Sequence, residues 1–292
     1  MAHKAGFVNL VGRPNAGKST LMNQLVGERV SIINRKAQTT RHRILGIVNT
    51  EDAQIVYSDT PGILEPKYAL QTSMMAFVKD AFKDADILLL LIDIKDKNPD
   101  FYGFEKALEH LEIPIIIILN KIDLSDQEGL VEASKRISEK FGDYPVHPIS
   151  ALENFGVEEL KMRILELLPE SPPYYDKDAL TDRSTRFFVS EMIRERILEH
   201  YQKEIPYSVE VEVEKYEEAQ DIVHISAVIY VSRKSQKGIL IGHKGEKLKI
   251  VGTESRKQIE EFIDKKVFLE LYVKVDEDWR NKERRLKAFG YK

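Results

Sequence analysis

Residues 12–19 combine two glycines, a lysine and a serine at a spacing that suits phosphate binding. They read Gly-Arg-Pro-Asn-Ala-Gly-Lys-Ser, which matches the pattern G-x-x-x-x-G-K-[ST], and they stand between an apolar run and a helical pattern. Glycines let the backbone wrap a phosphate chain with its N–H groups pointing inward, and the following helix adds the positive end of its dipole. We expect Lys18 to reach the β- and γ-phosphates and the Ser19 hydroxyl to bind Mg²⁺. The residues of this predicted nucleotide site are Gly12, Arg13, Pro14, Asn15, Ala16, Gly17, Lys18, Ser19 and Thr20.

Asp59-Thr-Pro-Gly62 stands where a later apolar run ends. The carboxyl ends of parallel strands lie beside the ligand in open α/β sheets, so this segment is expected close to the phosphate loop. We expect Asp59 to hold Mg²⁺ through a water molecule, and Gly62 to offer its N–H to the γ-phosphate.

The polar stretch Arg35-Lys-Ala-Gln-Thr-Thr-Arg41 has no apolar period and precedes the second expected strand. We expect a mobile switch loop, which closes when a γ-phosphate and a metal ion give it something to bind. Thr40 is our choice for the second hydroxyl on Mg²⁺, and Thr39 is the alternative. The expected metal ligands are Ser19, Thr40 and Asp59.

Asn120-Lys-Ile-Asp123 follows another apolar run and can select the base. Guanine presents its N1–H and N2–H donors side by side, so an ionised Asp123 can accept from both, whereas adenine would set an acceptor against an acceptor. Asn120 would bond the N7/O6 side of the base or brace the phosphate loop, and the Lys121 stem would pack on the ring. After the last strand, the Ala151 N–H is expected to donate to O6. The sequence therefore predicts GTP and GDP as ligands, with a base pocket made by Asn120, Lys121, Asp123, Ser150, Ala151 and Leu152.

Short apolar runs alternate with longer helical stretches through the first half, which is typical of a parallel sheet with crossover helices. The expected strands cover residues 7–11, 43–49, 53–58, 86–93, 114–119 and 146–149, and the expected helices 17–26, 66–83, 101–112, 126–141 and 156–168. Only Thr50-Glu-Asp52 separates the second and third strands, so these should form an antiparallel hairpin. We predict an α/β P-loop domain with a mostly parallel six-stranded sheet and one antiparallel edge strand.

A linker between two domains is expected within 169–182, where three prolines and four acidic residues occur and no period is visible. Beyond it we expect a helix over 184–204, strands over 207–215 and 221–232, a Gly-interrupted helical region over 235–263, a strand over 267–275 and a helix over 278–288. The predicted organisation is a nucleotide-binding domain at 1–170, a linker at 171–182, and an α+β module at 183–292 that ends in a basic helix.

The net charge of −4 conceals an uneven distribution. Residues 1–180 hold 21 basic and 27 acidic side chains, a net of −6, whereas 181–292 hold 23 and 21, a net of +2. The segment 233–257 concentrates eight basic residues against two acidic ones, so a polyanionic partner is plausible there. No apolar run approaches the roughly 18 residues of a spanning helix, no secretory signal is recognisable, and cysteine is absent. These features exclude disulfides and thiolate metal sites, and we expect a cytoplasmic location.

The motifs together resemble those of the TrmE-Era branch of bacterial GTPases. The segments that carry the resemblance are G-R-P-N-A-G-K-S, K-A-Q-T-T-R, D-T-P-G, N-K-I-D and S-A-L. In the basic region, Gly242-His-Lys-Gly245 looks like the G-x-x-G element of a type II KH domain, which clamps about four nucleotides of a single strand. A GTPase domain followed by an α+β type II KH domain is the layout of the Era family, and the resemblance covers nearly the whole chain, including 205–210 and 269–275.

The residues around this G-x-x-G element suit a single-stranded nucleic acid. Its glycines permit close approach to a phosphate chain, and the donors of His243 and Lys244 can reach phosphates. Five apolar neighbours could form a floor for bases, although we expect about half of them to be domain core; they are Ile239, Leu240, Ile241, Leu248 and Ile250. The predicted RNA-binding residues are Ile239, Ile241, Gly242, His243, Lys244, Gly245, Lys247 and Lys249. The basic run 280–285 is expected either to add phosphate contacts or to form a solvated helical face.

Resemblance to the Era family implies that the protein is a GTP-binding and GTP-hydrolysing switch that binds the 3′ end of 16S rRNA and acts in maturation of the 30S ribosomal subunit. We expect a monomer, with peripheral association at the inner face of the cell membrane as a further expectation. The alternative is a GTP-regulated interaction switch whose C-terminal module binds a protein or a membrane surface.

The residue after Gly62 sets an expectation for the rate. Ras-type enzymes have a glutamine there that orients the attacking water, whereas this chain has Ile63, so we predict slow intrinsic turnover. Asn15 resembles the asparagine that, in this branch, helps to hold K⁺ near the β–γ bridge in place of an arginine finger. We therefore hypothesise K⁺-stimulated hydrolysis. The residues expected to act in hydrolysis are Lys18, Thr40, Gly62 and Asn15.

Overall fold

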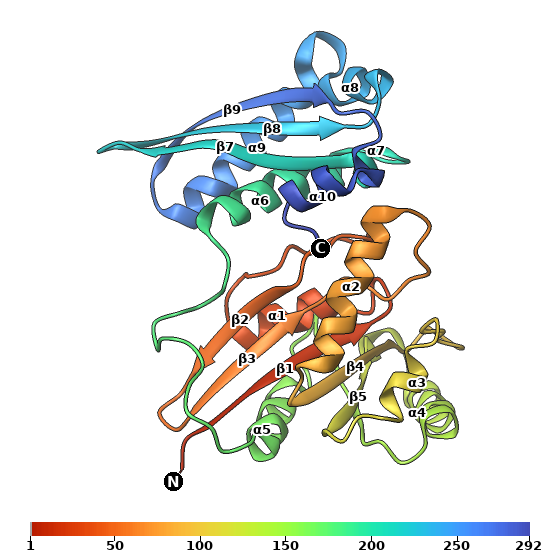
Figure 1. Cartoon of the computed structure of the whole chain (residues 1–292). Coiled ribbons are helices and arrows are strands. Elements are labelled where there is room, and N and C mark those ends of the chain that lie inside the picture. The colour runs from red at the N-terminus through yellow and green to blue at the C-terminus, as the bar shows by residue number, and fades with distance from the viewer. Residues whose placement is uncertain (1) are drawn as a thin grey trace. The chain divides into compact units, whose positions relative to one another are not determined.

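The protein is described here by a computed structural model of residues 2–292 (Figure 1). Its contacts divide the chain into two compact units. The first holds the segments up to Ile33, Thr40–Lys67 and Gln71–Asp182, and the second holds Asn34–Thr39, Tyr68–Leu70 and Arg183–Lys292. Each unit is described by itself below.

The first unit is built on a six-stranded sheet. Its strands are β1 (Lys4–Gly12), β2 (Ile44–Asn49), β3 (Ala53–Asp59), β4 (Ile87–Asp93), β5 (Ile115–Asn120) and β6 (Val146–Pro148), in the spatial order β2-β3-β1-β4-β5-β6. β2 pairs antiparallel with β3 at the edge of the sheet, and all other pairs are parallel. The predicted fold class, a mostly parallel sheet with one antiparallel edge strand, is confirmed for this unit.

Helices cover both faces of this sheet (Figure 1). They are α1 (Lys18–Val26), α2 (Ala69–Lys83), α3 (Glu105–Leu108), α4 (Gln127–Phe141) and α5 (Val157–Leu167), with a 3₁₀ turn, η1, at Ile122–Leu124. α1 and α5 pack on one face through side chains such as Leu21 and Leu160, which join Leu89 of β4 in a single buried cluster. The central strands are apolar on both faces, as expected for strands covered from both sides.

The helix expected over 101–112 is reduced to the single turn of α3. Tyr102 and Gly103 have φ angles of 52° and 88°, so the backbone there is left-handed and cannot join a right-handed helix. The Glu105 carboxylate accepts hydrogen bonds from the N–H groups of Phe101 and Gly103, which fixes this turn. The predicted helix was therefore wrong in extent.

The expected linker at 171–182 is ordered against the edge of the first unit. The N–H groups of Tyr174 and Tyr175 donate to Gln54 Oε1 of β3. Farther along, the Ile47 N–H of β2 donates to Leu180 O, and Thr181 forms an isolated bridge with β2. This strap pairs backbone groups that an edge strand would otherwise leave open.

The second unit has a three-stranded sheet in the order β7-β8-β9. Its elements are α6 (Thr185–His200), α7 (Ile205–Ser208), β7 (Val209–Glu218), β8 (Ile222–Val231), α8 (Lys234–Ile241), η2 (His243–Gly245), α9 (Glu246–Ile263), β9 (Lys266–Val275), η3 (Trp279–Asn281) and α10 (Glu283–Ala288). β7 and β8 are antiparallel, and β8 and β9 are parallel. α6 and α9 pack on one face of the sheet in the core of this unit, which confirms the predicted α+β class.

Two details of the second unit differ from the sequence-based expectation, and a third agrees with it. The first expected strand begins two residues late, because Ile205–Ser208 form one helical turn with Pro206 at its start. The helical region breaks into α8 and α9 at Gly242, which agrees with the Gly-interrupted region expected from the sequence. The C-terminal helix also divides, because Asp278 and Lys282 leave helical geometry on either side of η3.

Candidate functional site

The phosphate loop joins β1 to α1 and depends on two glycines. Gly12 and Gly17 have φ angles of 156° and 96°. A Cβ on Gly12 would lie 2.5 Å from the Leu91 carbonyl oxygen, and a Cβ on Gly17 would lie 2.1 Å from Asn120 Nδ2. The motif thus sits between a strand and a helix, as predicted, and neighbouring elements leave no room for side chains at these positions.

Lys18 points into this loop and is fully buried. Its ammonium donates to the carbonyl oxygens of Gly12 and Arg13, at 3.1 and 3.0 Å. Burial lowers the pKa of Lys18 to about 8, against the opposing effect of the Asp59 carboxylate. Burial likewise raises the pKa of Asp59, with Lys18 opposing the rise. Burial therefore disfavours the charged forms of both Lys18 and Asp59. An anionic ligand beside Lys18 would stabilise its ammonium.

The three expected metal ligands lie together. Ser19 Oγ donates to Asp59 Oδ2 at 2.7 Å, and Thr40 Oγ1 lies 3.2 Å from the same oxygen. Asp59 is fully buried, and its other oxygen, Oδ1, makes no hydrogen bond. A buried carboxylate oxygen with no partner next to two hydroxyls offers the hard oxygen donors that Mg²⁺ prefers, so the residues present fit this ion.

The alternative ligand Thr39 is directed elsewhere. Its hydroxyl donates to the Lys36 carbonyl oxygen at 2.6 Å, within the second unit. Of the two threonines, Thr40 is the one that the structure brings to Ser19 and Asp59.

Gly62 approaches the phosphate loop closely. A Cβ on Gly62 would lie 2.6 Å from the Pro14 nitrogen, so only glycine fits there. The next residue, Ile63, donates its N–H to Gly12 O at 3.0 Å, and its side chain is fully buried. The side chain at this position therefore turns into the core and cannot hold a water molecule at the phosphate.

The base-pocket motif follows β5, and its first residue braces two loops. Asn120 Nδ2 donates to Ala16 O at 2.8 Å, and Asn120 Oδ1 accepts from the Ala151 N–H at 3.0 Å. Of the two roles expected for Asn120, the structure shows the bracing one. We expected the Ala151 N–H to donate to guanine O6, but in this structure it donates to Asn120 Oδ1 instead. The sequence could not reveal this, because the two residues meet only through the fold.

Asp123 lies on the exposed turn η1 and is held by Ser150. Ser150 Oγ donates to Asp123 Oδ1 at 2.5 Å. Leu152, expected to close the pocket, is 70% exposed. The carboxylate is thus oriented from one side and remains accessible to a base edge from the other.

The Gly242–Gly245 turn connects α8 to α9. Gly242, Lys244 and Gly245 all have positive φ angles, of 74°, 47° and 82°. The end of α8, just before the turn, is held by the residue that follows α6, because the Tyr201 hydroxyl donates to Leu240 O at 2.5 Å. His243 and Lys244 are exposed at its tip.

Basic side chains around this turn are exposed and have no carboxylate partner among residues 2–292. They are Lys234, Lys237, Lys244, Lys247 and Lys249. Elsewhere in this unit several lysines form ion pairs, such as Lys265 with Glu218 and Lys274 with Glu214, each at 2.9 Å. Unpaired cations gathered at a glycine-rich turn suit a polyanion.

Comparison with known proteins identifies both units. A family model described as 50S ribosome-binding GTPase matches residues 7–121, and a KH domain model matches residues 204–280. The GTPase Era of Alkaliphilus metalliredigens is 45% identical over the whole of both chains. That of Geotalea uraniireducens is 44% identical over 99% of this chain and 98% of its own.

The chain belongs to the GTPase Era family. The protein is therefore a GTPase with a P-loop domain followed by a KH domain. Two solved Era structures are similar to it, each 37% identical with 99% of both chains covered. One is an Aquifex aeolicus Era variant bound to GDP and AlF4⁻, with a TM-score of 0.94. The other is Era in complex with MgGDPNP and nucleotides 1506–1542 of 16S ribosomal RNA, with a TM-score of 0.95.

The apolar set near the KH turn of this Era-family protein divides as expected. Leu240 is fully buried, and Ile241 and Leu248 pack against the core. Ile239 and Ile250 are 43% and 47% exposed. Only the latter two remain available to contact a base.

The basic C-terminal run has partners within the KH unit. Lys282 and Arg285 both pair with Asp276, at 3.1 and 2.5 Å. The Arg285 guanidinium also lies over the rings of Tyr230 and Phe289. These side chains hold α10 in place, whereas Arg284 of the same run is exposed.

Among residues 2–292, no helix combines the length and the apolar character that a membrane span requires.

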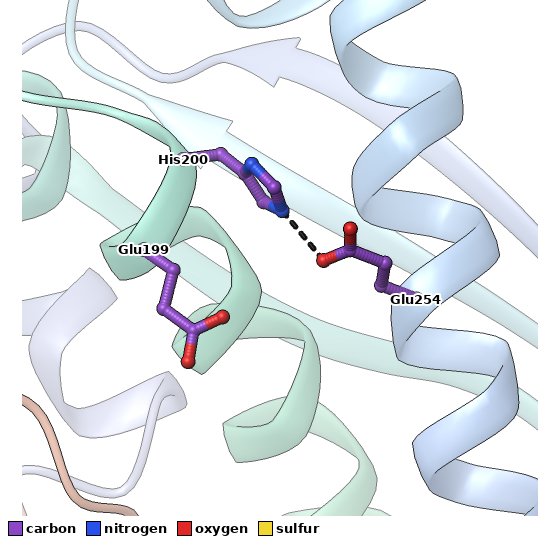
Figure 2. Close-up of side chains that lie close together, drawn as sticks. All are labelled: Glu199, His200 and Glu254. Atoms are coloured by element: carbon purple, nitrogen blue, oxygen red, sulfur yellow. Dashed lines mark hydrogen bonds and ion pairs between the residues drawn. The ribbon is translucent and has the colours of Figure 1, made fainter.

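Three potential metal donors gather where α6 faces α9 (Figure 2). His200 Nε2 lies 2.5 Å from Glu254 Oε2, whereas Glu199 pairs with Arg196 at 2.7 Å. All three donors thus have protein partners, and we assign no metal to them. The His200–Glu254 contact ties the end of α6 to α9 in the KH unit.

One carboxylate outside all the motifs contacts the base motif. Asp93, the last residue of β4, pairs with Lys121 at 2.6 Å. The signal that could have found it is a carboxylate that directly ends the apolar run Ile87–Ile92.

Proposed function

We propose that this Era-family GTPase binds the 3′ end of 16S rRNA through its KH unit and acts in maturation of the 30S ribosomal subunit. The observation that carries the proposal is the turn Gly242–Gly245, which has positive φ angles at Gly242, Lys244 and Gly245 and is surrounded by lysines that have no carboxylate partner in the described chain. The rRNA-bound Era structure supports the choice of this RNA.

In the nucleotide site, we assign contact with the β- and γ-phosphates to Lys18 and the phosphate-loop N–H groups. Ser19, Thr40 and Asp59 would hold Mg²⁺, which neutralises charge on the phosphates when bound. Gly62 offers its N–H to the γ-phosphate, and Asp123 accepts from the guanine edge. The Lys18 ammonium exchanges its bonds to Gly12 and Arg13 for bonds to phosphate. The contacts of Ser19, Thr40 and Asp59 with one another support this assignment.

Slow hydrolysis stimulated by K⁺ is a further part of the proposal. Ile63 is buried and cannot orient water. Asn15 has an exposed side chain and a left-handed φ of 63°, so its amide is free to turn toward a monovalent cation. We assign K⁺ binding to this amide.

We also propose the domain limits 1–170 and 183–292, with 171–182 as the connecting strap. The hydrogen bonds of Tyr174, Tyr175 and Leu180 to β2 and β3 support a strap that belongs with the first unit. A cytoplasmic, monomeric protein is proposed on the strength of the Era family, with membrane association confined to the periphery.

The test is the salt dependence of binding to a single-stranded oligonucleotide of the 16S rRNA 3′ end. Each phosphate that a lysine neutralises releases a counterion, which gives a slope of about −0.7 per contact on a double-logarithmic plot for single strands. Replacing Lys244 and Lys247 by alanine should weaken binding and reduce the magnitude of the slope by about 1.4.

Lys274→Ala is the matched control, because Lys274 is an exposed lysine of the same unit that already pairs with Glu214. This variant should bind the oligonucleotide as the wild type does. Two results would favour the alternative in which this unit binds a protein or a membrane surface. One is an affinity for the oligonucleotide that does not change with salt concentration, and the other is an equal loss of affinity in Lys274→Ala and in the double variant.

A further inference from the structure

β4 ends in a carboxylate that is fixed at both oxygens. Asp93 Oδ1 accepts a hydrogen bond from the Lys95 N–H at 2.9 Å, and Asp93 Oδ2 accepts one from the Lys121 ammonium at 2.6 Å. Asp93 stands directly opposite Asn120 in the parallel register of β4 and β5, which brings it beside the residue that follows. The carboxylate is thus placed by the sheet and by its own loop before any ligand arrives.

The Lys121 ammonium makes a second contact on the phosphate loop. It donates to the Asn15 carbonyl oxygen at 2.6 Å. Both Lys121 and Asn15 have left-handed backbones, with φ angles of 66° and 63°, a conformation that costs free energy in residues other than glycine. The ammonium therefore links two strained backbone positions, one in each nucleotide-binding segment.

Two adjacent residues of the base motif thus hold two adjacent carbonyl groups of the phosphate loop. Asn120 bonds Ala16 O, and Lys121 bonds Asn15 O. Asn120 is also held by the Ala151 N–H, whereas the lysine has Asp93 as its carboxylate partner. Without that partner, the flexible lysine stem has many rotamers available, and few of them keep its ammonium at Asn15.

We propose that Asp93 is a positioning residue for the guanine nucleotide, acting through Lys121. By holding the ammonium at Asn15, Asp93 keeps the lysine stem in the one arrangement that forms a wall for the base and fixes the phosphate loop to the base pocket. This inference rests on the proposed placement of guanine at Asp123, and its test separates the two.

The strength of the contact decides whether the effect is measurable. Isolated surface ion pairs contribute little. Here the two side chains are 29% and 25% exposed, and the short N–O distance belongs to a charge-assisted hydrogen bond, which is stronger than a neutral one. We expect loss of Asp93 to speed GDP release about tenfold.

The experiment measures the rate of GDP release from the full chain by displacement of a fluorescent GDP. Asp93→Asn should release GDP about tenfold faster than the wild type, and Asp93→Glu should recover part of the difference. Asp100→Asn is the control for the charge change, because Asp100 is an exposed carboxylate farther along the same loop, where it accepts a hydrogen bond from the Tyr102 N–H. Asp100→Asn should release GDP within about twofold of the wild-type rate.

A double-mutant cycle separates positioning from a loss of fold stability. In a Lys121→Ala background, Asp93→Asn should add almost nothing to the release rate, because its effect passes through the lysine. An equal acceleration in both backgrounds, or unchanged release in Asp93→Asn, would overturn the inference. Asp123→Asn reports separately on the pocket: if it leaves the preference for GDP over XDP unchanged, the proposed pocket fails as well.

Discussion

The hydroxyls of Ser19 and Thr40 lie 2.9 Å apart, and both hydrogen bond the same oxygen of Asp59. Ser19 lies in the first turn of α1, directly after the phosphate loop, whereas Thr40 belongs to the polar segment before β2. The contact therefore joins the phosphate loop to the switch segment. Asp59, with its second oxygen unpartnered, is the meeting point of the two.

The first prediction concerns the two neighbouring threonines. Thr40→Ala should lower the turnover number for GTP about a hundredfold, because it removes one of the hydroxyls proposed to hold Mg²⁺, the ion that neutralises charge on the phosphates. Thr39→Ala is the matched control, since its hydroxyl bonds the Lys36 carbonyl oxygen instead. Steady-state hydrolysis with Mg²⁺ present distinguishes them. A larger loss in Thr39→Ala would reverse the assignment of the metal ligand.

The second prediction concerns pH. The lowered pKa of Lys18, about 8, means that the ligand-free protein loses this proton above pH 8, whereas phosphates favour the protonated form. Binding must then restore the proton, so GDP affinity falls as pH rises, and Kd should increase about tenfold between pH 7 and pH 9. Calorimetric titration in buffers of different ionisation enthalpy would show proton uptake.

The lowered pKa of Lys18 also determines the direction in which folding stability changes with pH. A lysine whose pKa is lower in the folded state releases its proton earlier than in the unfolded chain, so its contribution to stability rises between pH 8 and about 10.5. Ligand affinity and this contribution thus change in opposite directions with pH. A GDP Kd that stays constant from pH 7 to pH 9 would contradict the burial of Lys18.

The third prediction tests the monovalent cation. Turnover of the wild type should be faster in K⁺ than in Na⁺ at equal ionic strength, and Asn15→Ala should abolish the difference. Asn98→Ala is the control, since Asn98 is an exposed asparagine in the loop after β4. Equal rates in both salts for the wild type would remove the role proposed for Asn15.

The fourth prediction concerns base selection. Asp123→Asn should bind XTP in preference to GTP, because an amide can donate to the carbonyl group that xanthine carries in place of the guanine amino group. Competition between the two nucleotides for the variant measures the change directly. Retained GTP affinity would place the base away from Asp123.

The GTPase fold was predictable because its strands are continuous apolar runs and its motifs end them. Ile87–Ile92 and Ile115–Leu119 indicate buried strands by composition alone, and the three-residue link before Ala53 dictates a hairpin. The site residues follow, since each motif stands at the carboxyl end of a strand and parallel strands bring those ends together.

The remaining features depend on contacts that no local pattern contains. The helix expected at 101–112 fails at Tyr102, a non-glycine residue in a left-handed conformation. The link between Ala151 and Asn120, and that between Asp93 and Lys121, join residues 31 and 28 positions apart. A sequence pattern shows which polar groups are available, but only the tertiary packing determines which of them form hydrogen bonds with each other.

We expect the bound nucleotide to control RNA binding, as the proposed GTP switch requires, and the affinity for the 16S rRNA 3′-end oligonucleotide in two nucleotide states tests this most directly. The full chain, saturated with a non-hydrolysable GTP analogue or with GDP, should bind the oligonucleotide with Kd values that differ between about 5-fold and 150-fold, the range typical of coupled sites. Reciprocally, the oligonucleotide should change nucleotide affinity by the same factor. Equal Kd values in both states would contradict the claim that GTP controls RNA binding.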